Sequence, residues 1–218
     1  MEKRSYSSHT NLLLPALEAY SNHLNFSELT SERKNLLRVL VDYLRLKTDQ
    51  GEPIYLNFIC THNSRRSQFS QIWAQTAAFY YGIPAYCFSG GIEVTAFSEK
   101  AVAAILRAGF QVENPGGENP HYQVQYAENA PTLSCFSKLT TDPANPTSTF
   151  AAVMTCSHAD QNCPFIPNAE QRIPIWYEDP KVFDNTPQEA EQYDGSCRLI
   201  ATEFFYVFEQ VRIKVKSF

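Results

Sequence analysis

Residues 55–67 read Tyr55-Leu56-Asn57-Phe58-Ile59-Cys60-Thr61-His62-Asn63-Ser64-Arg65-Arg66-Ser67. The first five form a short, mostly apolar run that is typical of a buried strand. The strand leads Cys60 into a polar loop that closes, after five intervening residues, with Arg66 and Ser67. Apolar residues then recur at helical spacing as far as Gly82, so we expect a helix to begin near Arg66. A strand, a tight polar loop and a helix predict an α/β fold with a site at the carboxyl end of the strand.

The loop contains the groups that an oxyanion-binding site with a thiolate nucleophile requires. Cys60 supplies the sulfur, and the guanidinium of Arg66 can share the charge of a bound anion. The loop N–H groups and the N-terminus of the following helix favour both the anion and a thiolate. Ser67 is placed to hold that thiolate. The predicted oxyanion-binding residues are Thr61, His62, Asn63, Ser64, Arg65, Arg66 and Ser67. The alternative from the residues alone is that Cys60 ends a buried strand as a small apolar side chain.

Composition narrows the class of protein. The chain has 218 residues and a formal net charge of −5, which argues against a broad nucleic-acid surface. We find no apolar run of membrane-spanning length, and the first residues lack a secretory signal pattern. Without such a signal, the six cysteines are expected to be reduced thiols. We therefore expect a cytoplasmic protein with no bound cofactor or metal.

The order of the predicted elements defines two regions. Residues 1–52 are interpreted as an N-terminal helical extension, with helices near residues 12–20 and 31–47 that pack on the rest or form a dimer surface. Residues 53–218 alternate strands and helices, which predicts a four-stranded, mostly parallel, doubly wound sheet. The expected elements are strands at 55–59, 85–89, 150–155 and 172–176, a helix at 98–108, a hairpin at 122–126 and 133–136, and a last helix opening at Thr186 with a capping box.

A second group of thiols follows the third predicted strand. Cys156 comes directly after it, and Cys163 lies seven positions later across a polar segment that we expect to be flexible. Such a pair suits successive thiol–disulfide exchange, in which each attacking thiolate must reach the sulfur before it. Two other interpretations stay open on spacing alone. Cys156, His158 and Cys163 could ligate a metal, although structural zinc sites usually have a fourth ligand and closer cysteines. The two thiols could also be unrelated buried residues.

The loop Cys60–Ser67, followed by Gln68, resembles the phosphate-binding loop of low-molecular-weight protein tyrosine phosphatases and of thioredoxin-coupled arsenate reductases, which share one fold. The run from Cys156 to Cys163, with Pro164 and Pro167 after it, resembles the redox segment of the reductases. Trp176-Tyr177-Glu178-Asp179-Pro180 resembles the Asp-Pro loop of both groups. The resemblance covers about residues 54–215 and leaves out residues 1–50 and 114–147. His62 and Arg65 depart from the phosphatase pattern, which has glycine and a small or apolar residue there.

The resemblance implies an arsenate reductase. In such an enzyme Cys60 attacks arsenate held by the loop and Arg66, Asp179 donates a proton, and Cys156 and then Cys163 pass the oxidation outward to thioredoxin. Asn63 would steady the loop, and Ser89 would support it from the second strand. From the residues alone, Asp179 can equally be a turn or cap residue before proline. The alternative function is a phosphatase that hydrolyses phosphotyrosine through a cysteinyl-phosphate on Cys60. A third interpretation is a noncatalytic oxyanion-binding module.

Overall fold

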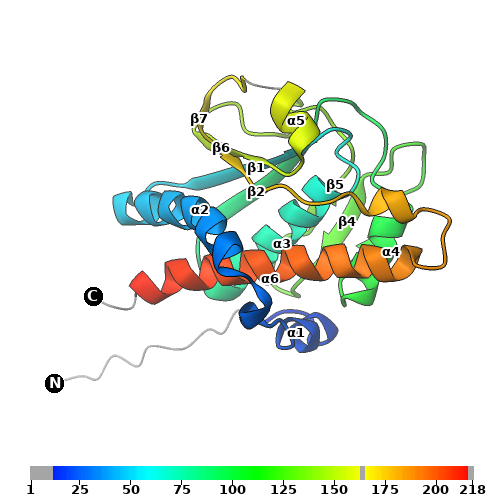
Figure 1. Ribbon diagram of the computed structural model, residues 1–218, viewed down its shortest axis with the longest axis horizontal. Helices are drawn as coiled ribbons and strands as arrows, with labels where there is room; N and C mark the ends of the chain where they lie inside the picture. The colour runs from blue at the N-terminus through cyan, green and yellow to red at the C-terminus, as the bar shows by residue number, and fades with distance from the viewer. Residues whose placement is uncertain (1–11, 163–164, 216–218) are drawn as a thin grey trace.

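A four-stranded parallel sheet forms the centre of the computed structural model, which describes residues 12–162 and 165–215 (Figure 1). Its strands are β1 (Ile54–Cys60), β2 (Ala85–Gly91), β6 (Phe150–Met154) and β7 (Ala169–Pro174), in the order β2-β1-β6-β7. All three pairings are parallel. The predicted parallel sheet is therefore confirmed. β7 begins three residues earlier than predicted, because Ala169 and Gln171 already pair with Phe150 and Ala151.

Alternation along β1 divides its side chains between two cores of unequal size. Ile54, Leu56 and Phe58 face the larger core, which is covered by α2 (Ser31–Gln50), α3 (Arg66–Tyr81) and α6 (Glu189–Val215). Ile59 and Cys60 belong to a smaller cluster on the other face with Met154 and Cys156. The short helix α5 (Ser157–Asn162) covers that cluster. α5 was not predicted, because the segment after Cys156 was interpreted as flexible; it forms one and a half turns instead.

The N-terminal helices share the larger core. α1 (Pro15–Ser21) has Pro15 in its first turn, where the missing N–H costs nothing. Leu17 of α1 and Leu37 and Leu44 of α2 are fully buried in the same cluster as residues of α6. α1 also packs closely on Gly109, where an added Cβ would lie 2.5 Å from the Leu17 nitrogen. The division at residue 52 stays a prediction, and the apolar core runs across it without interruption.

Residues 111–135 build a small antiparallel sheet beside the main one. It consists of β3 (Gln111–Glu113), β4 (Tyr122–Gln125) and β5 (Leu133–Cys135), in the order β3-β4-β5. The β4–β5 hairpin confirms the sequence prediction, whereas the three residues of β3 are too short to give a periodic signal. α4 (Glu99–Arg107) precedes this sheet and packs against α6.

The start of α6 differs from the sequence prediction. The helix begins at Glu189, after the 3-10 turn η2 (Pro180–Phe183), and not at Thr186. The Thr186 hydroxyl donates to the Phe183 carbonyl at 2.7 Å, so it is used by the preceding turn. The Glu189 carboxylate instead accepts from the Asn185 N–H at 2.7 Å. The predicted capping box is therefore wrong in register, while the helix itself is present.

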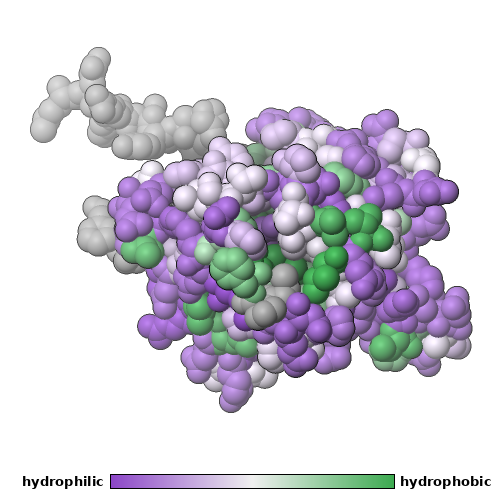
Figure 2. Space-filling model, turned by 90° about the horizontal axis from the view of Figure 1, so that it is seen from above, coloured by the Kyte–Doolittle hydropathy of each residue, from purple (hydrophilic) through white to green (hydrophobic). Residues whose placement is uncertain are grey.

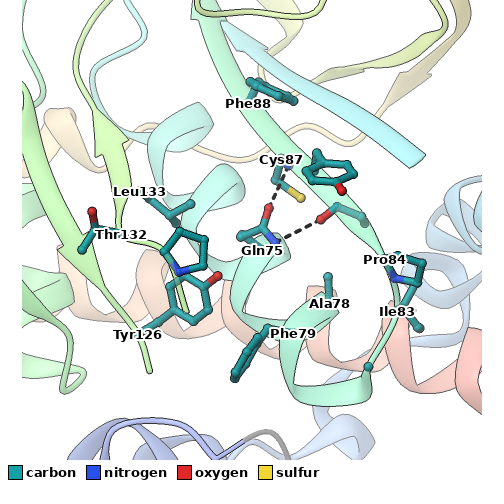
Figure 3. A pocket seen from close by; sticks show the side chains of 14 residues that line it. Gln75, Ala78, Phe79, Ile83, Pro84, Cys87, Phe88, Tyr126, Thr132 and Leu133 are labelled. Atoms are coloured by element: carbon teal, nitrogen blue, oxygen red, sulfur yellow. Dashed lines mark hydrogen bonds between the residues drawn. The ribbon is translucent and has the colours of Figure 1, made fainter. Parts of the chain in front are cut away.

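The outer side of β2 is partly filled by a side chain from α3. The Gln75 amide donates to the Ala85 carbonyl at 3.0 Å and accepts from the Cys87 N–H at 2.9 Å. Next to it lies a cavity of about 490 Å³ between α3, β2 and the β4–β5 hairpin (Figure 3). Phe79 and Tyr126, whose rings meet edge to face at 5.4 Å, form part of its wall.

Candidate active site

The loop between β1 and α3 is fixed by its carbonyl groups. The Thr61 carbonyl accepts from the Ile92 and Glu93 N–H groups at 2.8 and 2.9 Å, and the Ser64 carbonyl accepts from the Ser98 N–H at 3.0 Å. The His62 carbonyl accepts from the Ser137 hydroxyl at 2.8 Å, and the Asn63 carbonyl from the Gln68 amide at 3.0 Å. These bonds, all to groups outside the loop, fix its backbone through the carbonyls of residues 61–64.

Two residues allow the loop to take this shape. Asn63 has a φ of 47°, in the left-handed region that asparagine tolerates better than most side chains. Gly91 ends β2 against the loop, and a Cβ there would lie 2.8 Å from the Thr61 carbonyl oxygen and 2.9 Å from the Asn63 nitrogen. Only a glycine permits this close approach of backbone to backbone.

Asn63 also links the loop to Ser67, the neighbour of Cys60. Its amide donates to the Ser67 hydroxyl at 2.8 Å, and its side-chain oxygen accepts from the Lys138 N–H at 3.1 Å. The Ser67 oxygen lies 3.1 Å from Cys60 Sγ. Cys60, Asn63 and Ser67 are all buried. The contacts from Asn63 to Ser67 and from Ser67 to Cys60 therefore hold the sulfur in a defined position at the start of the loop.

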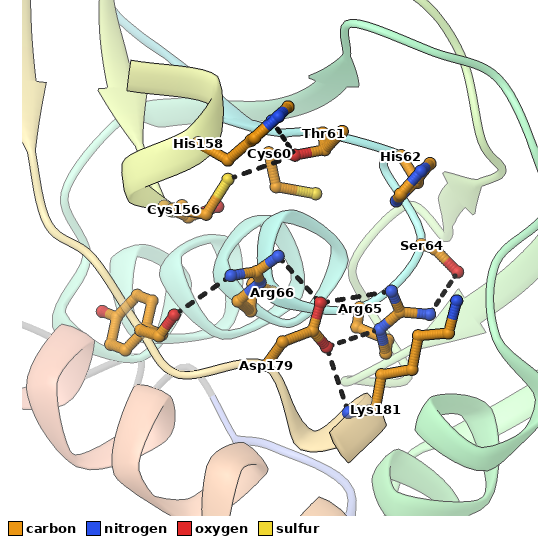
Figure 4. A network of polar contacts seen from close by, with 12 residues as sticks. Cys60, Thr61, His62, Ser64, Arg65, Arg66, Cys156, His158, Asp179 and Lys181 are labelled. Carbon is orange, nitrogen blue, oxygen red and sulfur yellow. Dashed lines mark hydrogen bonds and ion pairs between the residues drawn. The ribbon is translucent and has the colours of Figure 1, made fainter. Parts of the chain in front are cut away.

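A second thiol lies beside the first. Cys156 follows β6, which pairs with β1, and the Thr155 N–H donates to the Ile59 carbonyl at 2.7 Å. Cys156 Sγ lies 3.6 Å from the hydroxyl oxygen of Thr61 and accepts from the Ala159 N–H at 3.3 Å. His158 Nδ1 lies 3.2 Å from the same hydroxyl. The structure thus brings Cys60, Thr61 and Cys156 together at one edge of the sheet (Figure 4). Cys163 lies outside the described residues.

The Asp-Pro loop meets the start of α3 through two arginines (Figure 4). Arg65 Nε and Nη2 donate to the two carboxylate oxygens of Asp179 at 2.7 and 3.2 Å. Arg66 Nη2 donates to Asp179 Oδ2 at 2.8 Å, and its Nη1 donates to the Tyr177 carbonyl at 3.2 Å. Burial of Asp179 acts to raise its pKa, but the bonds from Arg65 and the charges of both arginines outweigh it, so the pKa is lowered.

Arg65 does not point to solvent. Only 9% of the residue is exposed, and it ties Asp179 to the loop. Ser89 does not support the loop directly, because its hydroxyl donates to the Gln71 side chain of α3 at 2.6 Å. His62 is half-buried and lies 3.2 Å from the Glu93 carboxylate.

Several residues that bind the loop could not be predicted from the sequence. Ser98, Ser137 and Lys138 bind the loop from segments 34 to 75 residues away in the chain, and no local motif marks them. Gln68 stood out in the sequence only as the residue that follows the motif. Its side-chain amide donates to the Asn63 and Phe136 carbonyls. Among residues 12–162 and 165–212, no three histidine, cysteine or acidic side chains are grouped as metal ligands.

Curated proteins similar to this chain are arsenate reductases. Over 162 residues the chain is 27% identical to the arsenate reductase of Staphylococcus aureus strain Newman, covering 74% of this chain and 92% of that protein. It is 26% identical over 123 residues to arsenate reductase 2 of Staphylococcus epidermidis, covering 56% of this chain and 76% of the relative.

The chain resembles arsenate reductases. The resemblance stated from its motifs is confirmed by these relatives. No family model matches the chain. A solved structure of a low-molecular-weight phosphotyrosine phosphatase from Vibrio cholerae O395 aligns with a TM-score of 0.47 and 12% identity, over 75% of this chain and 95% of that one.

None of the helices within the described part of the chain combines the length and apolar character needed to cross a bilayer.

Proposed function

We propose that this chain is an enzyme that reduces arsenate to arsenite, with Cys60 as nucleophile and a cysteine relay that carries the oxidation away. The observation that supports this most directly is the position of Cys156. Its sulfur lies against Thr61, the first residue after the nucleophile, at the end of the strand next to β1. A simple phosphatase needs no second thiol there. The names of the curated relatives point to the same reaction.

The first step is attack on arsenic. Arsenate sits over residues 61–66, bound by the loop N–H groups and by Arg66. The Cys60 thiolate forms an S–As bond as an As–O bond breaks, and the departing oxygen leaves as water. Asp179 lies beside the start of α3, where in the resting structure it accepts bonds from both arginines. It can act as the acid only after it takes up a proton.

The second step is the reduction itself. The Cys156 thiolate attacks Cys60 Sγ and forms a disulfide, and the electron pair of the S–As bond goes to arsenic. Arsenic is thereby reduced from As(V) to As(III) and leaves as arsenite, while the two cysteines are oxidised. The Ala159 N–H donates to the Cys156 sulfur at 3.3 Å and so holds it in position beside the loop.

The third step returns Cys60 to its thiolate. We propose that Cys163 attacks Cys156, so that the disulfide moves to Cys156–Cys163, where an external dithiol protein of the thioredoxin kind reduces it. The face that carries α5 bears a group of apolar residues within a mostly polar surface (Figure 2). Such a patch is suited to a protein partner. This chemistry requires a reducing compartment, and we place it in the cytoplasm.

A single-turnover experiment tests the proposed reaction. The reduced protein is mixed with arsenate, arsenite is measured, and disulfides are mapped by mass spectrometry. We expect the Cys60–Cys156 linkage in Cys163→Ser. In Cys156→Ser we expect the reaction to stop at the adduct on Cys60, because arsenite leaves only when Cys156 attacks Cys60. Cys87→Ala is the matched control, because Cys87 is a buried thiol of the larger core and should leave the relay intact. Absence of both the Cys60–Cys156 and the Cys156–Cys163 linkages would refute the reductase.

The second candidate function is hydrolysis of phosphotyrosine. It is favoured by the loop itself, which binds phosphate and arsenate through the same N–H groups and guanidinium. Cys60 would attack phosphorus, Asp179 would protonate the leaving phenolate, and water would cleave the cysteinyl-phosphate. Robust turnover of phosphotyrosine by the wild-type protein, without either disulfide after arsenate, would promote this function. Cys156→Ser should not affect it.

A further inference from the structure

The Asp179 carboxylate is held by four hydrogen bonds. Arg65 provides two of them, one to each oxygen, and Arg66 provides a third. The fourth comes from the Lys181 N–H, which donates to Oδ1 at 3.1 Å. All four bonded atoms are N–H donors. A proton on either carboxylate oxygen would therefore displace at least one of these bonds. Charge-assisted, bidentate hydrogen bonds between an arginine and a carboxylate are among the strong hydrogen bonds of proteins.

We propose that Arg65 is a specificity-determining residue that keeps Asp179 as an ionised carboxylate, and so favours an oxyanion carrying its own protons over a phosphate ester that must take one from the protein. This inference deepens the proposed function and rests on the same nucleophilic step at Cys60. Arg65 acts through Asp179, which makes it a positioning residue.

The proton balance of the two first steps differs. The arsenate monoanion H₂AsO₄⁻ reacts with the Cys60 thiolate to give Cys60–S–AsO₃²⁻ and H₂O, so both hydrogens of the departing water come from the substrate. An aryl phosphate dianion reacts with the same thiolate to give Cys60–S–PO₃²⁻ and a phenolate. That phenolate has a conjugate acid with a pKa of about 10 and leaves well only if it is protonated as the bond breaks. Asp179 is the group from which that proton would come.

Arg65, rather than Arg66, has to perform this task. A bound oxyanion requires the Arg66 guanidinium, which then shares or gives up its bond to Asp179. Arg65 keeps both of its bonds to the carboxylate during that change, because its two donors already face Asp179. Its side chain is only 10% exposed, so little solvent weakens the pair. An unpaired Asp179 beside the bound anion would be far easier to protonate.

The charged and titratable groups around Asp179 all favour its ionised form or lie farther away. From the loop and α3 it faces Arg65 and Arg66, and from η2 it faces the backbone of Lys181. Cys60 at the end of β1 and Tyr193 of α6 act on the guanidinium of Arg65 and not directly on Asp179. Tyr193 itself is tied to Asp184, to whose carboxylate its hydroxyl donates at 2.9 Å. Removal of Arg65 therefore removes the largest stabilising partner of the carboxylate.

The test compares the pH profile of aryl phosphate turnover in the wild-type protein and in Arg65→Gln. A lowered pKa at Asp179 confines its protonated form to acidic pH, so wild-type turnover should fall as pH rises toward neutrality. In Arg65→Gln this acid-dependent limb should move to higher pH, and turnover near neutral pH should rise by about tenfold or more, within the range of general acid catalysis. Arsenite release in a single turnover should show no such gain, because that step takes no proton from Asp179.

Two controls define the outcome. Arg107→Gln removes an exposed bidentate partner of Asp194 and should leave the profile unchanged. Asp179→Asn combined with Arg65→Gln should cancel the gain. An unshifted aryl phosphate profile in a folded Arg65→Gln protein would overturn the proposal, and so would equal losses with both substrates. If the wild-type protein releases no arsenite, the proposed function fails; the aryl phosphate profile still decides the role of Arg65.

Discussion

Asn63 makes more of the contacts that shape the loop than its place in the motif suggests. It adopts the left-handed φ of 47° and binds Ser67 and Lys138 with its side chain. Its carbonyl accepts from Gln68. One residue thus sets the turn of the loop, orients the hydroxyl beside Cys60 and fixes the segment that supports the loop from outside.

Replacement of Asn63 by alanine should reduce both stability and activity. Two buried hydrogen-bond partners lose their bonds and the left-handed backbone is strained, so we expect a loss of about 2–4 kcal/mol in the free energy of unfolding. Single-turnover arsenite release should fall by about tenfold or more, because an alignment error near the nucleophile is costly. Urea denaturation and rapid quench measure the two effects.

The matched control is Asn168→Ala. Asn168 also has a positive φ, of 62°, but it is exposed and its amide donates to the Thr147 carbonyl at 2.9 Å, away from the loop. It should lower stability by a smaller amount and leave arsenite release at the wild-type rate. If the two variants lose activity equally, the role assigned to Asn63 is wrong.

Residues close together in sequence were predictable, and pairs far apart were not. A strand, a tight loop and a helix in succession bring Cys60, Arg66 and Ser67 together, so their proximity could be predicted. The pairing of Arg65 with Asp179 joins positions 114 residues apart. Nothing in the local pattern distinguishes it from an arginine that faces solvent, since only the path of the Asp-Pro loop brings the two together.

At the scale of elements, the segment after β5 proves to be a support for the loop. Ser137 and Lys138 bind the His62 carbonyl and the Asn63 side chain. The Gly91 N–H donates to the Lys138 carbonyl at 2.8 Å, which joins the same segment to the end of β2. This segment lies in residues 114–147, which the family resemblance left out. It has no periodic pattern and works mainly through its backbone, so its sequence could not reveal the task.

The N-terminal helix α2 is joined to the Asp-Pro loop through a buried charge. Glu203 of α6 is fully buried and accepts from Arg33 Nε and Nη2 at 2.6 and 2.9 Å. The Tyr177 hydroxyl also donates to Glu203, at 2.7 Å, and the Tyr177 carbonyl accepts from Arg66. The helices that were interpreted as an extension thus help to position the loop that carries Asp179.

Arg33→Ala should be strongly destabilising, because it leaves the Glu203 charge buried with one neutral partner. Removal of one member of a buried ion pair costs about 3–5 kcal/mol. Arg38→Ala is the matched control on the same helix. Arg38 pairs with Asp42 at 3.7 Å on the surface, and its loss should change stability by less than about 1 kcal/mol. Urea denaturation of both variants gives the comparison, and similar stabilities would contradict the structural role of Arg33.

For the whole molecule, two carboxylates on separate elements link stability to pH in the same direction. Burial acts to raise the pKa of Glu170 on β7, but hydrogen bonds from Lys47 and Tyr43 of α2 lower it overall. Asp179 is lowered by its arginines. A carboxylate whose pKa is lower in the folded state contributes stability that is fully present above its unfolded pKa and is lost as pH falls through the folded value.

We therefore expect the free energy of unfolding to be nearly constant from neutral pH down to about 4.5, near the unfolded values, and to fall below it. Urea denaturation at a series of pH values measures this. Glu170→Gln should show a shallower acid decrease than the wild-type protein, because one of the linked groups is gone. A stability that rises below pH 4 would contradict the assignment of both carboxylates as ionised in the fold.

The Gln75 side chain of α3, which binds the outer edge of β2, affects whether another chain can pair with that edge. An uncovered outer strand offers a row of donors and acceptors on which a strand of another chain can assemble, and this is a route to aggregation. Gln75 already occupies the Ala85 carbonyl and the Cys87 N–H, as a single residue of an added strand would (Figure 3). The opposite outer strand, β7, carries Glu170, Arg172 and a terminal Pro174, which discourage pairing by charge and by a missing N–H. Both outer strands of the sheet thus discourage the addition of a fifth strand, by different means.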